Sequence, residues 1–416
     1  MKRFNRNNLP QYFHEAQKPD HSLGLEIENL LLDEEYRWVP FEVLHDIFSE
    51  LVEDGWRPVL IDGELLGAEK GSWNLSLEPG SQLELSLLPV EKIKHIGREY
   101  KEFMYELLPR LHERELGLYS LGYQPLTPLE NIKIIKKQRY AWMYEHFASL
   151  GGAGHHMMKA TAATQVSLDF SSEEDFAQKL RLTGLLSPYL SVLFDNSALR
   201  EGKPLKERLW RHTIWKKTDP MRSGILPGSL EEHFTYQGVI DDILGKDPIL
   251  YSEHGVLKLS GGKTSGELFP QQMDIEEWEH LLSMFFYDVR VRTYLEVRMM
   301  DSLPLPLILS AVAMLKGLIY NKEALLDATE LLLNDRKETP DVVKRVMEEG
   351  LRGRTKEILR QLIIYAGRSL EKEAKYLAGA VALVENEENL SDQLKRYYQT
   401  EGLDALKRRE VKLEFL

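Results

Sequence analysis

The side chains best suited to chemistry are acidic groups on four short segments in which apolar and polar residues alternate. These segments are residues 23–28, 77–86, 164–169 and 294–298. Alternation with a period of two predicts β-strands, because successive side chains of a strand point to opposite faces of the sheet. Leu, Ile and Val would then face a core. The opposite face would carry Glu26, Glu28, Glu84, Gln165 and Glu296.

Several carboxylates on one face of a sheet indicate a bound cation, because uncompensated acids repel one another and raise one another's pKa. Glu26 and Glu28 lie two residues apart and therefore point the same way on a strand. Glu78 and Glu84 flank a Pro-Gly turn and extend the polar face of the second segment. Mg²⁺ prefers such oxygen ligands. We therefore predict a divalent-metal site here, with a merely polar sheet face as the alternative.

Arginine side chains provide a second group that can bind anions. Arg298 lies two residues after Glu296, so it shares that face and can bind a phosphate or a carboxylate through paired hydrogen bonds. Residues 203–227 have no clear period, and we predict a long functional loop there. Its polar and aromatic residues include Arg211, His212, Trp215, Asp219 and Arg222. A surface loop anchored by one tryptophan fits this pattern equally well.

Composition excludes several classes of function. The chain of 416 residues carries 66 acidic and 53 basic side chains, which gives a net charge of −13. This balance argues against broad binding to nucleic acid or to an anionic membrane, although Mg²⁺ and a few arginines can still hold one nucleotide. The chain has no cysteine, which excludes disulfide bonds, thiolate metal sites and a cysteine nucleophile.

Membrane insertion and secretion are not expected from the apolar segments. The basic run at residues 1–13 contains no apolar stretch of the kind found in secretory signals. The apolar stretch 303–320 contains Pro304, Pro306 and Lys316, and it is shorter than the ~20 residues of a bilayer span. We predict a buried helix there and a cytoplasmic location for the protein.

Strand-like and helix-like periods alternate through about residue 320, which predicts an α+β fold. A helix is expected after Ser171 and Ser172, because serine followed by acidic residues is typical of a helix N-terminus. Other helices are expected at 42–53 and 90–111, and strands around 56–60 and 72–88. Beyond residue 321, charged amphipathic helices are expected at 322–334, 340–350, 355–384 and 392–409. We therefore predict a catalytic α+β domain over residues 1–320 and a helical C-terminal cap or subdomain over residues 321–416.

As an ordered set, segments within residues 20–320 resemble the glutamate–cysteine ligase family, in its plant-like and proteobacterial branch. The first segments that carry the resemblance are 24–28 (GLEIE), 76–86 (SLEPGSQLELS), 121–125 (LGYQP) and 165–173 (QVSLDFSSE). The later ones are 195–197 (DNS), 201–204 (EGKP), 215–219 (WKKTD), Arg222 with 224–227 (GILP), and 294–298 (YLEVR). Each motif is weak alone, and the ordered set is specific.

The resemblance implies a curved, mainly antiparallel sheet, the bowl of the glutamine synthetase-like carboxylate–amine ligases, with helices packed on its outside. It implies that ATP drives the joining of the γ-carboxylate of L-glutamate to the amine of L-cysteine through γ-glutamyl phosphate, the first step of glutathione-type thiol synthesis. ATP would be the co-substrate, and two or three Mg²⁺ ions, or Mn²⁺, would be bound. We expect a monomer or a homodimer that acts on small molecules.

The resemblance also implies roles for individual residues. Carried over residue by residue, it implies metal ligands at Glu26, Glu28, Glu78, Glu84, Gln165 and Glu296. The catalytic residues would be Arg298 and Arg222, and the nucleotide would contact Arg298, Gln165 and Ser167. The substrates would contact Arg222, Arg211, Trp215 and Gln124.

The chain departs from the plant pattern just before and within the segment at Gln165. Ala160 stands where plants carry an arginine, Ala162 near a plant cysteine, and Ser167 where plants carry asparagine. A related ligase that uses a different amine therefore stays open. From another class, paired carboxylates also fit a metal-dependent hydrolase of phosphate esters or glycosides. A catalytically silent binding protein could keep the same bowl.

Overall fold

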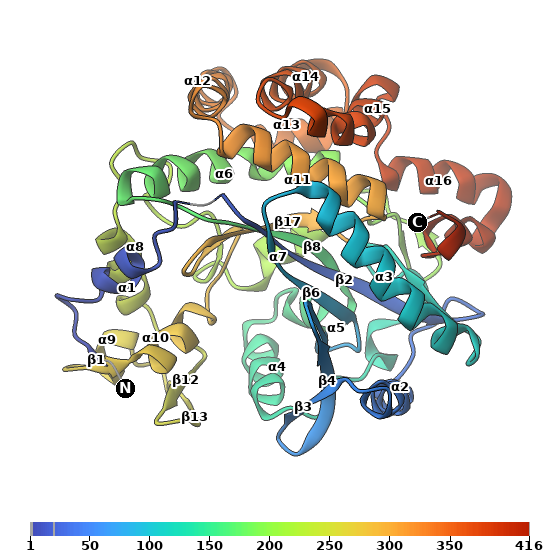
Figure 1. Ribbon diagram of the computed structural model, residues 1–416, viewed down its shortest axis with the longest axis horizontal. Coiled ribbons are helices and arrows are strands. Elements are labelled where there is room, and N and C mark those ends of the chain that lie inside the picture. Colours follow the sequence, from blue (N-terminus) through green and yellow to red (C-terminus); the bar gives the residue numbers. More distant parts are fainter. Residues whose placement is uncertain (1–2, 20, 416) are drawn as a thin grey trace.

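The centre of the molecule is an open sheet of nine strands in the computed structural model, which describes residues 3–19 and 21–415. The strand order is β16-β17-β8-β2-β6-β5-β4-β3, and β7 pairs with the C-terminal part of β2. All of these pairings are antiparallel. The bounds are β2 (Leu23–Asp33), β3 (Arg57–Ile61), β4 (Glu64–Lys70), β5 (Trp73–Leu77), β6 (Leu83–Val90), β7 (Leu116–Tyr119), β8 (Ala163–Leu168), β16 (Val289–Val291) and β17 (Leu295–Asp301). The prediction of an α+β fold with a curved, mainly antiparallel sheet is confirmed (Figure 1).

Smaller elements surround this sheet. Pairs of short strands are β1 (Arg3–Phe4) with β14 (Met273–Asp274), β9 (Leu199–Arg200) with β10 (Lys203–Pro204), β11 (Ser223–Gly224) with β15 (Phe286–Tyr287), and β12 (Leu250–Glu253) with β13 (Val256–Leu259). Helices up to residue 320 are α1 (Pro10–Glu15), α2 (Phe41–Glu53), α3 (Ile93–His112), η1 (Leu129–Asn131), α4 (Gln138–Leu150), α5 (Gly154–Ala160), α6 (Glu173–Leu193), α7 (Trp210–Thr218), α8 (Tyr236–Leu244), α9 (Ser265–Leu268), α10 (Ile275–Leu282) and α11 (Leu305–Ile319).

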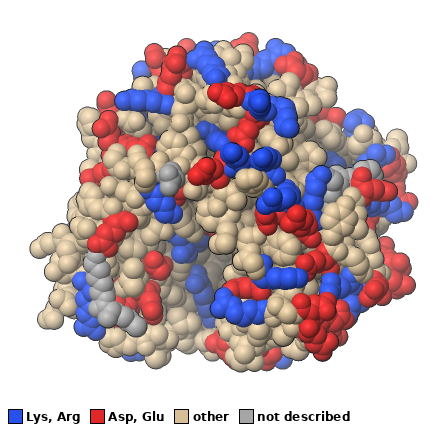
Figure 2. All heavy atoms as spheres, viewed as in Figure 1, with Lys and Arg blue, Asp and Glu red and all other residues tan. Residues whose placement is uncertain are grey.

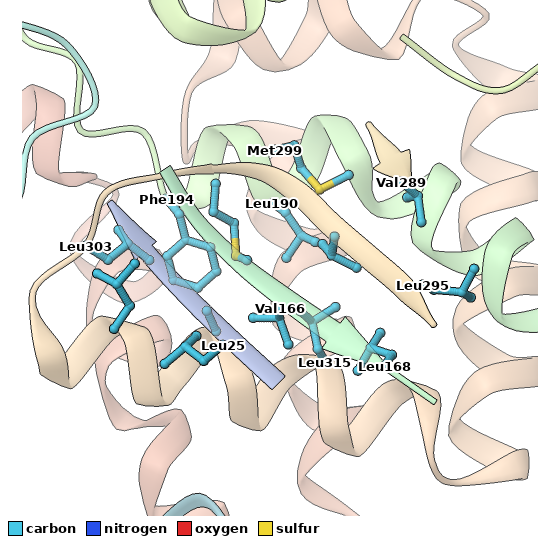
Figure 3. Packing of buried hydrophobic residues seen from close by; sticks show 14 of the residues in the cluster. Leu25, Val166, Leu168, Leu190, Phe194, Val289, Leu295, Met299, Leu303 and Leu315 are labelled. Atoms are coloured by element: carbon cyan, nitrogen blue, oxygen red, sulfur yellow. The ribbon is translucent and has the colours of Figure 1, made fainter. Parts of the chain in front are cut away.

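The strands form where apolar and polar residues alternate, and β2 shows the result. Leu25 and Ile27 are buried on one face of the sheet, whereas Glu26 and Glu28 point to the other face and are half-buried. Figure 3 shows the apolar face packed against α6 and α11. The residues labelled there include Leu25, Val166, Leu168 and Leu295 of the sheet, Leu190 of α6, Phe194 at the end of that helix, and Leu315 of α11. Because helices cover the apolar face, the acidic face is the one that can form a site.

Two of the covering helices were expected from the sequence. Helix α6 begins after Ser172, whose hydroxyl accepts a hydrogen bond from the Asp175 N–H, as the N-cap prediction requires. Helix α11 begins after Pro304 and is buried along most of its length, which confirms the prediction of a buried helix in 303–320. Among the described residues no single helix is long and apolar enough to cross a membrane; only α11 and α12 together meet that test, across a 97° bend.

A further layer of helices lies over α6 and α11, on the side away from the sheet (Figure 1). Its elements are α12 (Lys322–Glu338), α13 (Val342–Glu349), α14 (Gly353–Gly367), η2 (Glu371–Leu377) and α15 (Ala378–Asn386). The last elements, α16 (Leu390–Glu401), η3 (Gly402–Arg409) and η4 (Leu413–Phe415), lie instead beside β7, α3 and the C-terminal end of β2. The helical character predicted beyond residue 321 is confirmed. The single helix predicted over 355–384 is wrong, because the chain turns after Gly367 so that Leu370 and Leu377 can be buried.

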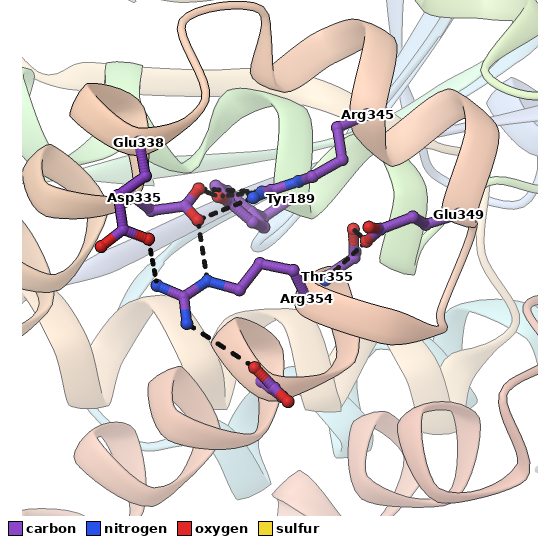
Figure 4. A network of polar contacts seen from close by, with 8 residues as sticks. Tyr189, Asp335, Glu338, Arg345, Glu349, Arg354 and Thr355 are labelled. Carbon is purple, nitrogen blue, oxygen red and sulfur yellow. Dashed lines mark hydrogen bonds and ion pairs between the residues drawn. The ribbon is translucent and has the colours of Figure 1, made fainter.

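A buried carboxylate fixes this outer layer to α6. Asp335 of α12 is fully buried and forms ion pairs with Arg345, at 2.7 Å, and with Arg354, at 3.1 Å. It also accepts a hydrogen bond from the Tyr189 hydroxyl of α6. Figure 4 shows these groups converging from α6, α12, α13 and α14. Burial alone would raise the pKa of Asp335, but its hydrogen bonds from Arg345 and Tyr189 outweigh burial and lower it.

Two features of the molecule bear on contacts between copies: the distribution of charge on its surface and the composition of an edge strand. Acidic and basic side chains lie side by side over the face shown in Figure 2. At one edge of the sheet, β3 contains Pro58, which pairs with Ala68 and has no N–H to donate. Arg57 beside it is exposed. The edge strand therefore offers few groups to a further strand.

Candidate active site

Four neighbouring strands place acidic and amide side chains on the face of the sheet opposite the helices. The register sets Glu28 of β2 directly opposite Glu84 of β6, and Glu26 opposite Gln165 of β8. Directly opposed residues in an antiparallel pair have Cβ atoms about 5 Å apart. Their side chains therefore lie within reach of a common ion.

These groups line a cavity of about 270 Å³. Its acidic and amide residues are Glu26, Glu28, Glu78, Glu84, Gln82 and Gln165. Its basic residues are Lys137, Arg139, Arg211, Arg290, Arg292 and Arg298. Apolar and aromatic residues, among them Met143, Met157, Met158, Trp215 and Phe286, complete the wall. The cavity therefore combines both signs of charge with an apolar side.

Hydrogen bonds from β8 fix the Glu28 carboxylate. The backbone N–H of Ala163 donates to its Oε2 at 2.8 Å, and Gln165 Nε2 donates to its Oε1 at 2.7 Å. On β6, Glu84 accepts a 3.1 Å hydrogen bond from the Ser76 hydroxyl of β5. Both carboxylates keep unused lone pairs, so each can also bind a cation.

Burial and mutual repulsion disfavour the charged form of these acids. Burial raises the pKa of Glu28 to about 8, and Glu78 adds to the effect. Burial likewise raises the pKa of Glu26 to about 7, with a contribution from Glu296. The pKa of Glu84 is raised by burial and then by Glu78. A divalent cation would relieve this repulsion, so the acids present fit a metal site.

Glu296 has a different environment from the other acids. It is fully buried, and Arg290 binds both of its oxygens, through Nε at 2.6 Å and Nη2 at 3.0 Å. Arg298 Nη1 donates to Glu296 at 2.8 Å and to Gln165 Oε1 at 2.6 Å. Burial alone would raise the pKa of Glu296, but the two arginines lower it to about 2. Glu296 therefore orients two arginines, and it does not itself line the cavity.

Several basic groups at the cavity, buried or half-buried, form no ion pair with a carboxylate among the described residues. Arg211 is 4% exposed, and its Nη1 donates to the Arg298 carbonyl at 3.1 Å. The Nε atoms of Arg211, Arg139 and Arg292 are buried and have no hydrogen-bond partner within residues 3–19 and 21–415. Burial lowers the pKa of Arg139 and that of Lys137. An anion in the cavity would compensate these charges, so the residues present also fit a bound phosphate chain.

Three residues predicted from the sequence lie elsewhere. Arg222 is buried in ion pairs with Asp219, at 2.6 Å, and Asp247, at 2.9 Å, and does not line the cavity. Gln124 accepts hydrogen bonds from two backbone N–H groups of its own turn, at residues 126 and 127. Ser167 lies in register with Glu296, outside the lining. The structure gives all three a supporting position.

The predicted loop over 203–227 is wrong in part, because it contains helix α7. Leu209 precedes the helix in a left-handed conformation, with φ of 55°, and no side chain caps the N-terminus. The usual start signals are therefore missing. Arg211 and Trp215, four residues apart on α7, both face the cavity, as predicted substrate-binding residues should.

Sequence reasoning missed four basic residues of the site: Lys137, Arg139, Arg290 and Arg292. The last two could have been found, because the Val-Arg-Val-Arg run at 289–292 has the same period of two as the predicted strands. Lys137 and Arg139 lie at the start of α4. We find no pattern in the sequence that would have placed them here.

The fold is also seen in a solved glutamate–cysteine ligase. The structure superposes on the glutamate–cysteine ligase of Francisella tularensis in complex with AMP with a TM-score of 0.55, over 95% of this chain and 90% of the other. The two sequences are 12% identical, so the likeness shows the fold alone.

The chain belongs to glutamate–cysteine ligase family 2, whose family model matches residues 22–408. It is 28% identical over 400 residues to the chloroplastic glutamate–cysteine ligase B of Oryza sativa subsp. japonica, covering 91% of this chain and 79% of that protein. It is 32% identical over 278 residues to the chloroplastic glutamate–cysteine ligase of Arabidopsis thaliana, covering 65% of this chain and 53% of that protein. The match to the family includes most of the C-terminal helical layer, which the sequence motifs did not reach.

Proposed function

We propose that this protein is an ATP-dependent glutamate–cysteine ligase, which joins the γ-carboxylate of L-glutamate to the amine of L-cysteine. The observation that carries the proposal is the convergence of Glu26, Glu28, Glu78 and Glu84 beside six basic side chains in one cavity. A nucleotide polyphosphate with divalent cations needs both signs of charge in one place. Membership of the ligase family supports the same conclusion.

The acidic residues would hold the metal. Two or three Mg²⁺ ions, or Mn²⁺, would be bound by Glu26, Glu28, Glu78, Glu84 and Gln165. When bound, the ions supply positive charge against the phosphate oxygens of ATP. Glu296 contributes indirectly, because it holds Arg290 and Arg298 in fixed positions.

The reaction needs an activated carboxylate, because a free carboxylate is a poor acylating agent. The γ-phosphoryl group of ATP moves to the γ-carboxylate of glutamate, which gives γ-glutamyl phosphate and ADP. The cysteine amine then attacks the acyl carbon, and inorganic phosphate leaves. Arg298, and Arg290 beside it, would bind the oxygens on which negative charge develops. No protein nucleophile is required, and positioning supplies much of the rate.

Substrate contacts fall to α7 and its neighbours. Arg211 is buried with an unpartnered Nε, and it stacks with Trp215, whose ring centroid lies 5.9 Å from the guanidinium carbon. We assign to this pair the carboxylate of an amino-acid substrate. The methionines of the apolar wall suit a small thiol side chain, because sulfur and thioether groups are both polarizable. Arg222 and Gln124 would support the loops around the site.

The test is a coupled assay with purified protein, MgATP and L-glutamate. We expect ADP, phosphate and γ-glutamylcysteine to appear together when L-cysteine is added. Glutamate labelled with ¹⁸O in its γ-carboxylate should pass one labelled oxygen to phosphate, because the acyl phosphate intermediate requires it.

The same assay separates the competing functions. Phosphate release that needs glutamate and an amine other than cysteine would show a ligase with a different acceptor. Phosphate release without any amine would indicate a hydrolase, and no release with any proteinogenic amino acid would indicate a silent binding protein. We include in the proposal a cytoplasmic location and a monomeric or homodimeric state.

A further inference from the structure

A second cavity lies on the other side of α7 from the candidate active site. Its volume is about 270 Å³, the same as that of the active-site cavity. It is enclosed by α6, α7, the segment at Gly224 and Ile225, and the turn between α12 and α13. Most of its wall is apolar, with Leu185, Pro188, Ile225, Leu332 and Val342 among the lining residues.

Helix α7 separates the two cavities and has one row of side chains for each. Arg211 and Trp215 line the active-site cavity, whereas His212 and Lys216 line the second. Each pair is spaced by four residues and so lies on one side of the helix, and the two rows differ by one residue, or about 100° of rotation. A small void of about 20 Å³, which contacts Arg211, His212 and Asp288, lies between the two cavities.

Inside the second cavity, Asp288 is a carboxylate without a basic partner. The Ser187 hydroxyl donates to it, but no lysine or arginine among the described residues pairs with it. Burial, opposed by the charge of Asp288, lowers the pKa of His212 beside it, so that imidazole is neutral near pH 7. A half-buried acid in a mainly apolar wall leaves room for a cationic group of a ligand.

The cavity also has two basic residues, Lys216 and Arg336, which are exposed and form no ion pair with any described residue. They suit a negatively charged group that stays near solvent. A second acid, Asp341, also lines the cavity, but it is exposed and its side chain accepts a hydrogen bond from the Lys344 N–H at the start of α13. The cavity therefore has an inner acid, an apolar wall and, near solvent, two bases and this helix-capping acid. An α-amino acid with an apolar side chain presents an ammonium, an apolar body and a carboxylate in one molecule of suitable size.

We propose that this second cavity is a binding site for a zwitterionic amino acid with an apolar side chain, separate from the substrate site. Asp288 binds the ammonium group, and Lys216 and Arg336 bind the carboxylate. The apolar residues of the wall cover the side chain. Binding here is independent of the proposed function, whereas the effector role described below rests on it.

The wall of the cavity is fixed before a ligand arrives. Tyr189, at the end of the α6 wall, donates to the buried Asp335, which also holds Arg345 of α13 and Arg354 of α14 (Figure 4). These bonds position the turn between α12 and α13 against α6. A preformed wall lowers the entropic cost of binding.

A ligand at Asp288 would act on Arg298 through one direct contact, and α7 provides a second, indirect link. The Arg298 N–H donates to the Asp288 carbonyl at 3.1 Å, and the Arg298 carbonyl accepts from Arg211 of α7 at 3.1 Å. The Arg298 guanidinium lies 5.6 Å from the centroid of the Trp215 ring. Asp288, which lines the second cavity, therefore holds the backbone N–H of Arg298. The backbone carbonyl of Arg298 is held by α7, the helix that also carries His212 and Lys216 of the second cavity.

Isothermal titration of the full-length protein, without ATP or glutamate, tests the site. The probes are L-leucine, 3-methylbutylamine, which lacks the carboxylate, and 4-methylpentanoate, which lacks the amine. We expect leucine to bind with one site per chain, and each incomplete probe to bind about tenfold more weakly or worse.

Variants locate the bound probe. Asp288→Asn keeps the shape and the Ser187 contact, and it should weaken leucine about tenfold while leaving 4-methylpentanoate unchanged. Val343→Phe should fill the cavity, which Val343 lines, and abolish binding of all three probes. The double variant Lys216→Gln, Arg336→Gln should weaken the binding of leucine. The matched double variant Lys217→Gln, Lys337→Gln changes lysines outside the cavity lining and should leave the binding unchanged.

The outcomes decide the proposal. The proposal is overturned if titration with leucine gives no saturable heat. It is also overturned if leucine binds equally well to the wild type, Asp288→Asn and Val343→Phe, because leucine would then bind at another site. The effector role is supported if leucine changes the KM for glutamate in the wild type and not in Asp288→Asn, each compared with its own rate without leucine. If the protein has no ligase activity, the titration still tests the binding site.

Discussion

The position of Glu28 is set by its neighbours on β8 and needs no metal. The Ala163 N–H and the Gln165 amide donate to different oxygens of the carboxylate. Arg298 in turn donates to the oxygen of the same Gln165 amide. Gln165 therefore connects the acidic and basic halves of the cavity. Such prior positioning is the condition for strong electrostatic catalysis.

Replacing Glu28 with Gln should abolish most of the turnover. The substitution keeps the size of the side chain and removes the negative charge that a metal ligand needs. We expect kcat to fall by about 100-fold or more, since removal of one positioned charge or dipole costs this much in comparable sites. Steady-state assays with saturating substrates measure the loss.

Glu64→Gln is the matched control, because Glu64 is exposed at the start of β4 and far along the sheet from the cavity lining. It should leave kcat unchanged. A Glu28→Gln variant with wild-type kcat would remove Glu28 from the site.

The stability of the metal-free protein should depend on pH in a direction set by Glu26 and Glu28. Their pKa values are raised to about 7 and about 8 in the folded protein, from about 4.3 in an unfolded chain. Between these limits the folded state binds more protons than the unfolded state, so the free energy of unfolding falls as pH rises. We expect urea unfolding in EDTA to show this fall between about pH 5 and about pH 8.

Added Mg²⁺ should reverse most of the fall at the upper end of this range, because the ion binds the charged carboxylates. The Glu28→Gln variant, which lacks one of the carboxyl groups with a raised pKa, should show a shallower dependence in EDTA. Equal slopes for the variant and the wild type would contradict the assignment of the raised pKa to Glu28.

The acidic residues of the cavity could be predicted from the sequence, whereas many of its basic residues could not. Glu26, Glu28 and Glu84 follow from a period of two, which fixes the face of a strand on which a side chain lies. The cross-strand partners do not follow, because the register between β2 and β6 depends on where distant strands meet. For the same reason the pairing of Glu296 with Arg290 on β16 could not be predicted, and the metal role of Glu296 implied by the resemblance stays a prediction.

At the scale of elements, α6 connects a local sequence signal to the sheet. Ser172 caps the helix, and the helix then covers the apolar side of β17. Ser172→Ala should lower the free energy of unfolding by about 1 kcal/mol, and Ser172→Gly by only a few tenths, as at other N-caps. Urea unfolding compares the two variants. Equal losses would show that the cap hydrogen bond is not the source of the effect.

The Asp335 cluster makes a larger prediction, because its carboxylate is fully buried between two arginines. Asp335→Asn removes the charge and leaves Arg345 uncompensated, so we expect a loss of about 3 kcal/mol in the free energy of unfolding. Glu338→Gln is the control, since Glu338 contacts the same Arg354 at the surface and should cost less than about 1 kcal/mol. A similar loss in both variants would contradict the argument.

Elements with strong periods were predicted well, and elements with mixed faces were not. Helices α2, α3, α6 and α11 lie where the sequence places them. Helix α7 was missed because both of its polar sides face cavities, so no apolar stripe marks it. Turns such as the one after Gly367 depend on tertiary burial, which local patterns do not record.

At the scale of the whole molecule, one hydrophobic core crosses the predicted domain boundary at 320. The same buried cluster includes residues from Phe4 to Val411, with both sheet and outer helices represented. We therefore expect calorimetry to show one unfolding transition for the full chain. Two resolved transitions would show instead that residues 321–416 fold independently.

The class of fold was predictable because alternating strands and helices limit the possible architectures. The order of the strands was not, since β8 pairs with β2, and β17 with β8, each after more than a hundred residues of intervening chain. That long-range pairing is what brings Gln165 and Arg298 to Glu28. The local spacing of residues does not predict this pairing.

Pro58 on the outermost strand has a consequence for handling the protein. Concentrated preparations of open-sheet proteins can polymerise when the last strand of one copy adds to another copy. Here a proline interrupts the row of backbone donors, and the exposed Arg57 next to it adds charge. Replacing Pro58 with a β-branched residue in an engineered version would restore the row of backbone N–H donors and promote the formation of fibrous aggregates.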